Sequence, residues 1–300
     1  MTFERNRYCS TCPRDEVAYD GDCTRNKPDG YIARCGPPWT IEKHWYVEGY
    51  CEIFSKAMPN SFPKMNFIDL FSGPGLYYHR PSGSVFRGSP LIASRYGFRK
   101  IILCDLKERN IEALKFRLKD SDRDIEFLTG DSNALAKRIN STLPPDSLSF
   151  CFADPDNMRQ LRFDTLRELA DKRRVDLLIN FPYGNSFKRG AANAYKSNRR
   201  NTAFDLYFGT NGWRQLFSNH RLCFSPQLAL EILELYLAEF YKIGYIEPDA
   251  PYDQNYVIIR NTLNREIYYL IFLSKNRLGY RFWSEAVRYI KGRNLSLSLE

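Results

Sequence analysis

Short apolar runs alternate with longer amphipathic stretches along most of the 300-residue chain. Apolar runs bounded by polar turns indicate strands, and stretches with one apolar face indicate helices. The pattern predicts strands at residues 66–71, 100–105, 124–128, 149–154 and 175–180. It predicts helices between them at 89–96, 107–118, 132–140 and 164–172. Strands that alternate with helices in this way form a parallel sheet.

The pattern changes after the fifth predicted strand. A stretch rich in basic and aromatic residues, 185–225, precedes a helix expected at 226–243. Two further strands, at 256–261 and 266–274, flank a short polar turn and are expected to pair as a hairpin. The predicted fold is therefore α/β, a doubly wound Rossmann-like sheet that ends in a β-hairpin. An ordinary nucleotide-binding Rossmann domain would continue with another parallel strand.

These boundaries divide the chain into four parts. Residues 1–38 are rich in Gly, Pro, Asp, Arg and Cys and lack apolar periodicity, so they need a cross-link or a bound metal ion to fold. Residues 39–65 contain a helix of about 18 residues that begins at Thr40 and ends before Pro59. The Rossmann-like domain is expected to comprise 66–184 and 226–300, with 185–225 inserted as a substrate-binding region.

Clustered cysteines in the N-terminal segment could form such a metal site. Four thiolates can hold a zinc ion in tetrahedral geometry, and metal binding would supply the missing folding energy. An iron–sulfur cluster and unligated thiols are the alternatives. The candidate metal ligands are Cys9, Cys12, Cys23 and Cys35.

A glycine turn follows the first strand of the Rossmann-like domain, in the sequence Phe-Ile-Asp-Leu-Phe-Ser-Gly-Pro-Gly at 67–75. Glycine permits a tight turn and lets a cofactor lie against the backbone. Polar side chains also follow the next strands, and the carboxyl ends of parallel strands share one edge of the sheet. The candidate cofactor-binding residues are Asp69, Phe71, Gly73, Gly75, Asp105, Leu106, Asp131 and Ser132.

Two of these carboxylates have distinct expected roles. Asp105 ends the second strand, where it can accept hydrogen bonds from both hydroxyls of a ribose. Asp131 follows the third strand, within reach of the exocyclic amine of an adenine. The alternative for each is a helix cap, Asp105 for the helix at 107–118 and Asp131 for the helix at 132–140.

Several segments together resemble one known family. They are 67–75, Arg-Gly-Ser-Pro-Leu-Ile-Ala at 87–93, Gly-Asp-Ser-Asn at 130–133, Phe-Ala-Asp-Pro at 152–155 and 268–275, preceded by Trp39, Lys43 and His44. In this order they resemble the three-Cys-motif partner family, over roughly residues 39 to 290. The resemblance implies a class I methyltransferase-like domain that binds S-adenosylmethionine (SAM), and a three-cysteine radical-SAM-like protein as partner. It implies no substrate, and the N-terminal cysteine segment departs from the family pattern.

Two proline turns compete for the catalytic role, Asp-Pro-Asp-Asn at 154–157 and Asn-Phe-Pro-Tyr at 180–183. Amino methyltransferases commonly use an Asp/Asn-Pro-Pro-Tyr-like turn, whose oxygens orient an amine toward the methyl donor while an aromatic ring stacks on the base. Asp154 lies at the expected position, the end of the fourth strand, but its turn lacks the aromatic residue. The turn from Asn180 to Tyr183 has the expected composition but lies one strand later. Strand-ending turns capped by Asp or Asn are the structural alternative. The candidate catalytic residues are Asp154, Pro155, Asn180 and Tyr183.

The segment 185–225 carries seven basic residues against the single acidic residue Asp205. Basic side chains neutralise phosphates and aromatic rings stack on bases, so this composition favours nucleic acid, DNA or RNA. The alternative is that the aromatic residues form the segment's own core. The candidate nucleic-acid contacts are Lys188, Arg189, Lys196, Arg199 and Arg200.

The overall charge agrees with a polyanionic partner. The chain has 44 Lys and Arg residues against 35 Asp and Glu, a formal net charge of +9. The start of the sequence lacks the apolar stretch of a signal peptide, and the longest apolar run, 267–273, is far shorter than a membrane span. We therefore expect a cytoplasmic protein without membrane association.

These observations favour a SAM-dependent methyltransferase that acts on nucleic acid, with an amine as acceptor. The second hypothesis is a SAM- or nucleotide-binding subunit without activity that serves a three-cysteine radical-SAM-like protein. A metal-dependent nuclease is disfavoured, because the acidic residues occur singly at strand ends.

Overall fold

Seven strands form one sheet in the computed structural model, which describes residues 24–26, 29–57, 64–79, 84–171, 173–197, 199–248 and 255–297. Their order is β10 (Tyr256–Arg260), β11 (Glu266–Leu273), β9 (Arg174–Phe181), β8 (Leu148–Ala153), β3 (Met65–Asp69), β6 (Lys100–Asp105) and β7 (Asp124–Thr129). Only β11 runs antiparallel to its neighbours in this sheet. The predicted doubly wound α/β sheet with a terminal hairpin is confirmed.

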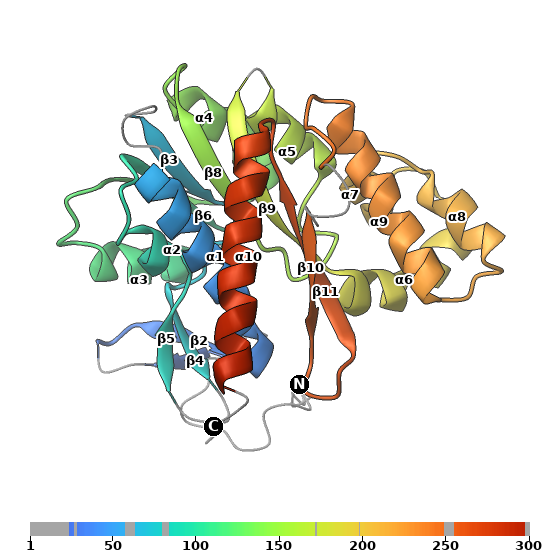
Figure 1. Cartoon of the computed structure of the whole chain (residues 1–300), viewed down its shortest axis with the longest axis horizontal. Coiled ribbons are helices and arrows are strands. Elements are labelled where there is room, and N and C mark those ends of the chain that lie inside the picture. The colour runs from blue at the N-terminus through green and yellow to red at the C-terminus, as the bar shows by residue number, and fades with distance from the viewer. Residues whose placement is uncertain are drawn as a thin grey trace.

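Successive strand residues point to opposite sides of the sheet, so both of its faces are apolar. Helices cover both faces. Phe67 and Ile101 belong to one buried cluster, and Ile68 and Ile102 belong to the other. The first face is covered by α1 (Pro38–Ala57), α2 (Ser89–Ala93), α3 (Glu108–Arg117) and α10 (Arg277–Leu297). The second is covered by α4 (Ser132–Thr142), α5 (Phe163–Ala170), α7 (Ala203–Phe208) and α9 (Pro226–Tyr241). In Figure 1, α1 and α10 lie next to one another on the same face of the sheet.

A second, four-stranded sheet lies beyond the carboxyl edge of the large one (Figure 1). It consists of β1 (Thr24–Asn26), β2 (Ile32–Gly36), β4 (Leu76–His79) and β5 (Val85–Arg87), in that order. Because β2 pairs in parallel with β4, part of the Cys-rich segment is tied to the chain that leaves the glycine turn. Residues 1–23 lie outside the described residues.

One arginine of α3 fastens the small sheet to the glycine turn. The guanidinium of Arg117 donates to the carboxylate of Asp29 at 2.9 Å and to the carbonyl oxygens of Ile32 and Pro74 at 2.8 and 2.5 Å. Its side chain is only 5% exposed. The N-terminal strands are therefore held in place by an ion pair whose arginine is buried.

The insertion begins with a π-helical turn (Tyr183–Phe187) and continues through α6 (Lys188–Lys196), α7 and α8 (Trp213–Asn219). Its aromatic side chains join the core beneath β9. Fully or almost fully buried are Phe187, Phe204, Tyr207, Phe208 and Trp213. The interpretation of these rings as a core is thus confirmed, and they are not available to stack on bases. No described helix has both the length and the apolar character needed to cross a membrane.

Candidate functional site

The glycine turn leaves β3 through two left-handed residues, Gly73 with φ of 60° and Gly75 with φ of 84°. A Cβ on Gly75 would lie only 2.7 Å from Cδ2 of Leu114, so this position requires glycine for space as well as for conformation. The buried carboxylate of Asp69 accepts a hydrogen bond from the Phe71 amide at 3.1 Å. Burial, reinforced by the nearby Asp154 and Asp105 carboxylates, raises the pKa of Asp69 to about 7.

Asp105 connects the glycine turn to α3. Its Oδ2 accepts from the Gly73 amide at 2.8 Å, and its Oδ1 accepts from the Lys107 amide and the Asn110 side chain at 2.8 and 2.9 Å. Asp105 is not the N-cap residue of α3, a position that Lys107 occupies, so its carboxylate contacts the start of the helix without capping it. An ionised carboxylate has about four acceptor sites, so Oδ2 retains capacity for a ligand.

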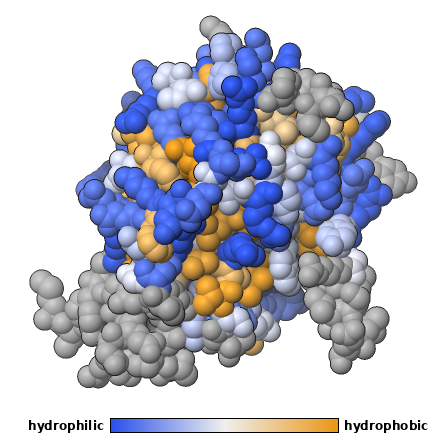
Figure 2. Space-filling view, turned by 90° about the vertical axis from the view of Figure 1, so that its left-hand side faces the viewer, coloured by the Kyte–Doolittle hydropathy of each residue, from blue (hydrophilic) through white to orange (hydrophobic). Residues whose placement is uncertain are grey.

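The neighbouring strand ends add an apolar and a polar group. Leu106 follows Asp105 and is 69% exposed. Figure 2 shows apolar residues reaching the surface among hydrophilic ones on one side of the molecule. Asp131 is exposed and caps α4 by accepting from the Asn133 amide at 2.9 Å. The hydroxyl of Ser132 is buried and has no hydrogen-bond partner among the described residues.

Asp154, Asn180 and Lys43 form a buried polar cluster at the ends of β8 and β9 and on α1. The ammonium of Lys43 forms an ion pair with Oδ2 of Asp154, and both side chains are 8% exposed. The amide nitrogen of Asn180 donates to Oδ1 of Asp154 at 2.8 Å and to the Pro155 carbonyl oxygen at 3.2 Å. Both partners are acceptors, which sets the orientation of the Asn180 amide. Its Oδ1 is buried and has no partner among the described residues.

This cluster borders a pocket of about 960 Å³. Six basic side chains line it, of which Lys43 pairs with Asp154 and Arg34 pairs with Asp156 at 2.6 Å. Arg260 pairs with Glu266 at 3.2 Å, and the other three are Lys188, Arg189 and Arg265. The two predicted turns, at 154–157 and 180–183, therefore meet at one pocket, through Asp154 and Asn180.

Tyr183 does not line this pocket. Its ring is fully buried and stacks on Phe187 at a centroid distance of 5.5 Å. The described aromatic residues at the pocket include Trp39, Tyr268 and the 37% exposed Phe224. The stacking role expected for Tyr183 is not compatible with this position, because β9 continues to Phe181 and the π-helical turn directs Tyr183 into the core.

Lys43 belongs to the segments that carry the family resemblance but was not among the candidate site residues, although it pairs with Asp154 at the pocket. Its neighbour His44 is also buried, with Nδ1 2.7 Å from the Thr40 carbonyl oxygen. Burial and the adjacent Lys43 ammonium lower the pKa of His44 to about 4, so the ring is neutral at pH 7. The only signal in the sequence was a Lys-His pair on an otherwise amphipathic helix.

The candidate nucleic-acid residues lie on the surface of the insertion. Lys188 and Arg189 are exposed at the pocket, and the Lys188 ammonium lies 5.1 Å from the Tyr183 ring centroid. Lys196, Arg199 and Arg200 are exposed further along. The basic face of the insertion is thus continuous with the pocket that contains Asp154.

Of the four candidate zinc ligands, only Cys35 lies among the described residues, where it is buried in β2 and lines the pocket. Cys9, Cys12 and Cys23 lie outside them. Within the part of the chain that the structure describes, no three His, Cys, Asp or Glu residues are grouped to hold a metal ion.

Comparison with known proteins supports the fold. No family model matches the chain, and no curated protein matches it. The Legionella pneumophila protein LPL1258 is 11% identical with a TM-score of 0.50, over 84% of this chain and 92% of its own. M. jannaschii TYW2 in complex with AdoMet is 9% identical with a TM-score of 0.39, over 86% and 87%. Geranyl diphosphate methyltransferase in complex with GPP and sinefungin is 12% identical with a TM-score of 0.36, over 75% and 77%. The similarity to LPL1258 shows the fold alone.

Proposed function

We propose that this protein is a SAM-dependent methyltransferase that acts on an amine of nucleic acid. The sheet order supports this class, because a reversed strand, β11, is inserted between β9 and β10 at the end of a parallel Rossmann-like sheet. Ligands of open α/β sheets bind at the carboxyl ends of the strands, where the glycine turn, Asp105 and Asp154 all lie.

The residues at the strand ends support SAM as the proposed cofactor. Gly73 and Gly75 let the cofactor lie close to the protein backbone, and Asp105 retains acceptor capacity for the ribose hydroxyls. Leu106 offers an exposed apolar surface for the adenine ring, and the hydroxyl of Ser132 has no partner among the described residues. Asp69, Phe71 and Asp131 complete the set, and the bound cofactor would supply the electrophilic methyl group.

The unpartnered Oδ1 of Asn180 is the observation that favours an amine acceptor. A buried acceptor without a partner carries a desolvation cost that a substrate N–H can remove. An amine that donates to this oxygen and to Asp154 keeps its lone pair free for attack. The carboxylate of Asp154, which pairs with the Lys43 ammonium, can receive a proton from the methylated amine.

Nucleic acid is proposed as substrate because of the charge at the pocket and on the insertion. Lys188, Arg189, Lys196, Arg199 and Arg200 lie on the exposed face beside the Asp154 pocket. Guanidinium and ammonium groups neutralise phosphates, while Trp39 and Phe224 provide apolar walls for a planar base.

The test compares Asp154→Asn with Asn180→Ala in methyl transfer from labelled SAM to total RNA and DNA. Asp154→Asn should lower turnover about 100-fold and leave SAM affinity nearly unchanged, because the carboxylate acts mainly in the transition state. Asn180→Ala should weaken acceptor binding more than turnover. Asp164→Asn, which changes an exposed carboxylate of α5, is the matched control.

Two outcomes would contradict the proposal. Absence of SAM binding to the unmodified protein would exclude the class. If Asn180→Ala were inactive and Asp154→Asn normally active, Asn180 would be the catalytic residue and Asp154 the residue that binds the acceptor. SAM binding without transfer to either nucleic acid would instead favour a non-catalytic partner of a three-cysteine radical-SAM-like protein.

A further inference from the structure

A second pocket, of about 750 Å³, lies beside α6. Its walls are the loop that follows β8, one face of α6 and the segment 199–204. Four arginines line it, and no Asp or Glu is present among the described residues that line it. They are Arg159, Arg189, Arg199 and Arg200. Its volume lies within the range of ligand pockets, and its charge is of one sign.

Local contacts fix the walls of this arginine pocket. A Cβ on Gly190 would lie 2.8 Å from the Phe204 ring, so α6 packs closely against α7. The Met158 amide donates to the Ser186 hydroxyl at 3.1 Å, which ties the loop after β8 to the start of the insertion. The Arg159 amide donates to the Asn157 side chain at 2.9 Å. The backbone around the pocket is therefore positioned before any ligand binds.

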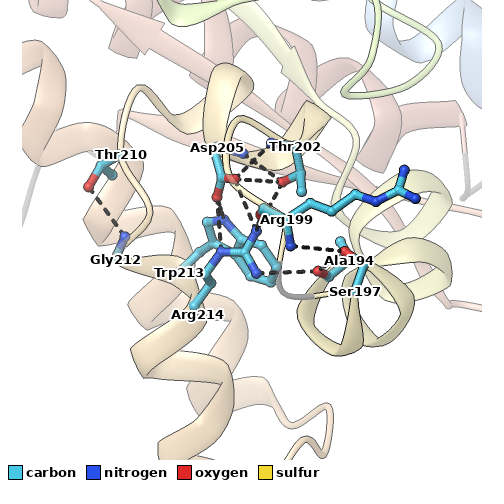
Figure 3. A network of polar contacts seen from close by, with 9 residues as sticks. All are labelled: Ala194, Ser197, Arg199, Thr202, Asp205, Thr210, Gly212, Trp213 and Arg214. Atoms are coloured by element: carbon cyan, nitrogen blue, oxygen red, sulfur yellow. Dashed lines mark hydrogen bonds and ion pairs between the residues drawn. The ribbon is translucent and has the colours of Figure 1, made fainter.

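Asp205, the single acidic residue of 185–225, is not available to neutralise the pocket. Its carboxylate accepts from the Arg214 guanidinium at 3.0 Å and from the Trp213 indole at 2.8 Å (Figure 3). Although burial opposes the effect, these hydrogen bonds and those from Thr202 lower the pKa of Asp205 below its usual value. The charge of Asp205 is thus compensated by Arg214 inside the insertion.

Arg214 also joins two walls of the arginine pocket. It donates to the carbonyl oxygens of Arg199 at 2.8 Å and Ala194 at 3.2 Å. This holds the Arg199 backbone while its guanidinium extends away from the Asp205 network, as Figure 3 shows. Arg199 and Arg200 are both exposed, and the backbone of Arg199 is held by Arg214.

The arginine pocket and the Asp154 pocket share two lining residues, Asn157 and Arg189. We propose that the arginine pocket binds backbone phosphate of the same nucleic-acid strand whose target base enters the Asp154 pocket. This proposal rests on the proposed function. Guanidinium groups bind phosphate oxygens through two parallel hydrogen bonds, and arginines on opposite walls can hold one phosphate from two sides. The strand is single-stranded or locally opened at this point, because a paired base cannot enter a pocket.

The experiment uses one arginine from each wall of the pocket, in the double variant Arg159→Ala/Arg199→Ala. Affinity for short fluorescein-labelled single-stranded RNA and DNA of random sequence is measured by anisotropy as a function of salt. Loss of two phosphate contacts should weaken binding at least about tenfold and reduce the slope of log K against log salt by roughly 1.4, about 0.7 per contact. The KM of methyl transfer to these oligonucleotides should rise, with little change in kcat.

Two matched variants separate phosphate recognition from bulk charge. Lys137→Ala/Arg138→Ala removes two exposed basic residues from α4 and should leave affinity and salt slope near those of the unmodified protein. Arg159→Lys/Arg199→Lys keeps the charge but not the bidentate geometry, and should preserve the slope while losing part of the affinity.

The outcomes distinguish this inference from the proposed function. Equal losses in the α4 variant and in Arg159→Ala/Arg199→Ala would overturn the inference. So would methyl transfer to oligonucleotides with unchanged affinity in Arg159→Ala/Arg199→Ala, and in that case the proposed function would stand. A protein that binds SAM but neither RNA nor DNA, even at low salt, would overturn both the nucleic-acid substrate and the inference.

Discussion

Asp105 is the carboxylate that links the glycine turn to α3, at the position proposed for the cofactor. Its contacts with the Gly73 amide and with α3 place a negative charge beside the glycine turn. Asp105→Ala should lower SAM affinity by roughly 10- to 100-fold, because hydrogen bonds to charged groups contribute about 1.5–3 kcal/mol. Calorimetric titration of SAM measures the loss, with the exposed Asp122→Ala as control. Unchanged affinity in Asp105→Ala would remove this residue from the site.

Residues at strand ends were predictable because the topology of a parallel sheet places them on one edge. Asp105 and Asp154 could be found for this reason. Lys43 could not, since it lies 111 residues before Asp154 and meets it only through the packing of α1. By analogy with a motif, Tyr183 was expected to stack on a base at the site, whereas its ring is buried by the π-helical turn, which no sequence pattern indicated.

At the scale of elements, the small sheet depends on Arg117. Arg117→Met should reduce the free energy of unfolding by about 3 kcal/mol, because it leaves the Asp29 carboxylate and buried carbonyl oxygens without their donor. Urea denaturation measures this change. Lys115→Met, at an exposed position of the same helix, should change stability by less than about 0.5 kcal/mol. Equal effects of the two substitutions would show that Arg117 does not stabilise the small sheet.

The N-terminal cysteine segment carries a separate prediction, about its metal. We expect about one zinc ion per chain in elemental analysis of protein purified without chelator. Cys12→Ser should lose this zinc, whereas Cys223→Ser, at an exposed cysteine outside the segment, should retain it. Iron in place of zinc, or absence of any metal from the unmodified protein, would refute this assignment.

At the scale of the whole molecule, one buried carboxylate is expected to shape stability against pH. Burial raises the pKa of Asp176 to about 6 from 3.8, although Ser274 and Tyr50, at 2.6 Å, donate hydrogen bonds to it. The folded protein therefore binds this proton more tightly than the unfolded chain. As pH rises from about 4 to about 6, this group should lower the free energy of unfolding by roughly 3 kcal/mol in total.

Asp176→Asn should remove this part of the pH dependence, which urea denaturation across that range would measure as a flatter profile than that of the unmodified protein. Asp164→Asn provides the control at an exposed carboxylate. Parallel profiles for Asp176→Asn and the unmodified protein would contradict the prediction. Asp69 also titrates near neutral pH, so the comparison between proteins, and not the absolute slope, isolates Asp176.

The large sheet was predictable because its strands are continuous apolar runs between amphipathic helices. The small sheet was not, since β1, β2, β4 and β5 have three to five residues each and β2 pairs with β4 across the whole of α1 and β3. The C-terminal helix α10 was also missed. Its apolar face is evident only once α1 is placed against it, where Ala286 and Ile290 lie within 3.4 Å of the Cβ position of Gly49.

The aromatic core of the insertion has a consequence for protein engineering. Phe187 and Phe208 pack in the same cluster as Phe181 of β9 and Tyr236 of α9, so the segment shares its interior with the sheet. It is therefore not a transplantable module. Grafting 185–225 onto another scaffold would transfer the arginines but leave the rings against a foreign surface, and excising it would expose Phe181 and Tyr236 to water. Retargeting this protein would have to proceed through substitutions of its exposed arginines, with the buried face of the segment left intact.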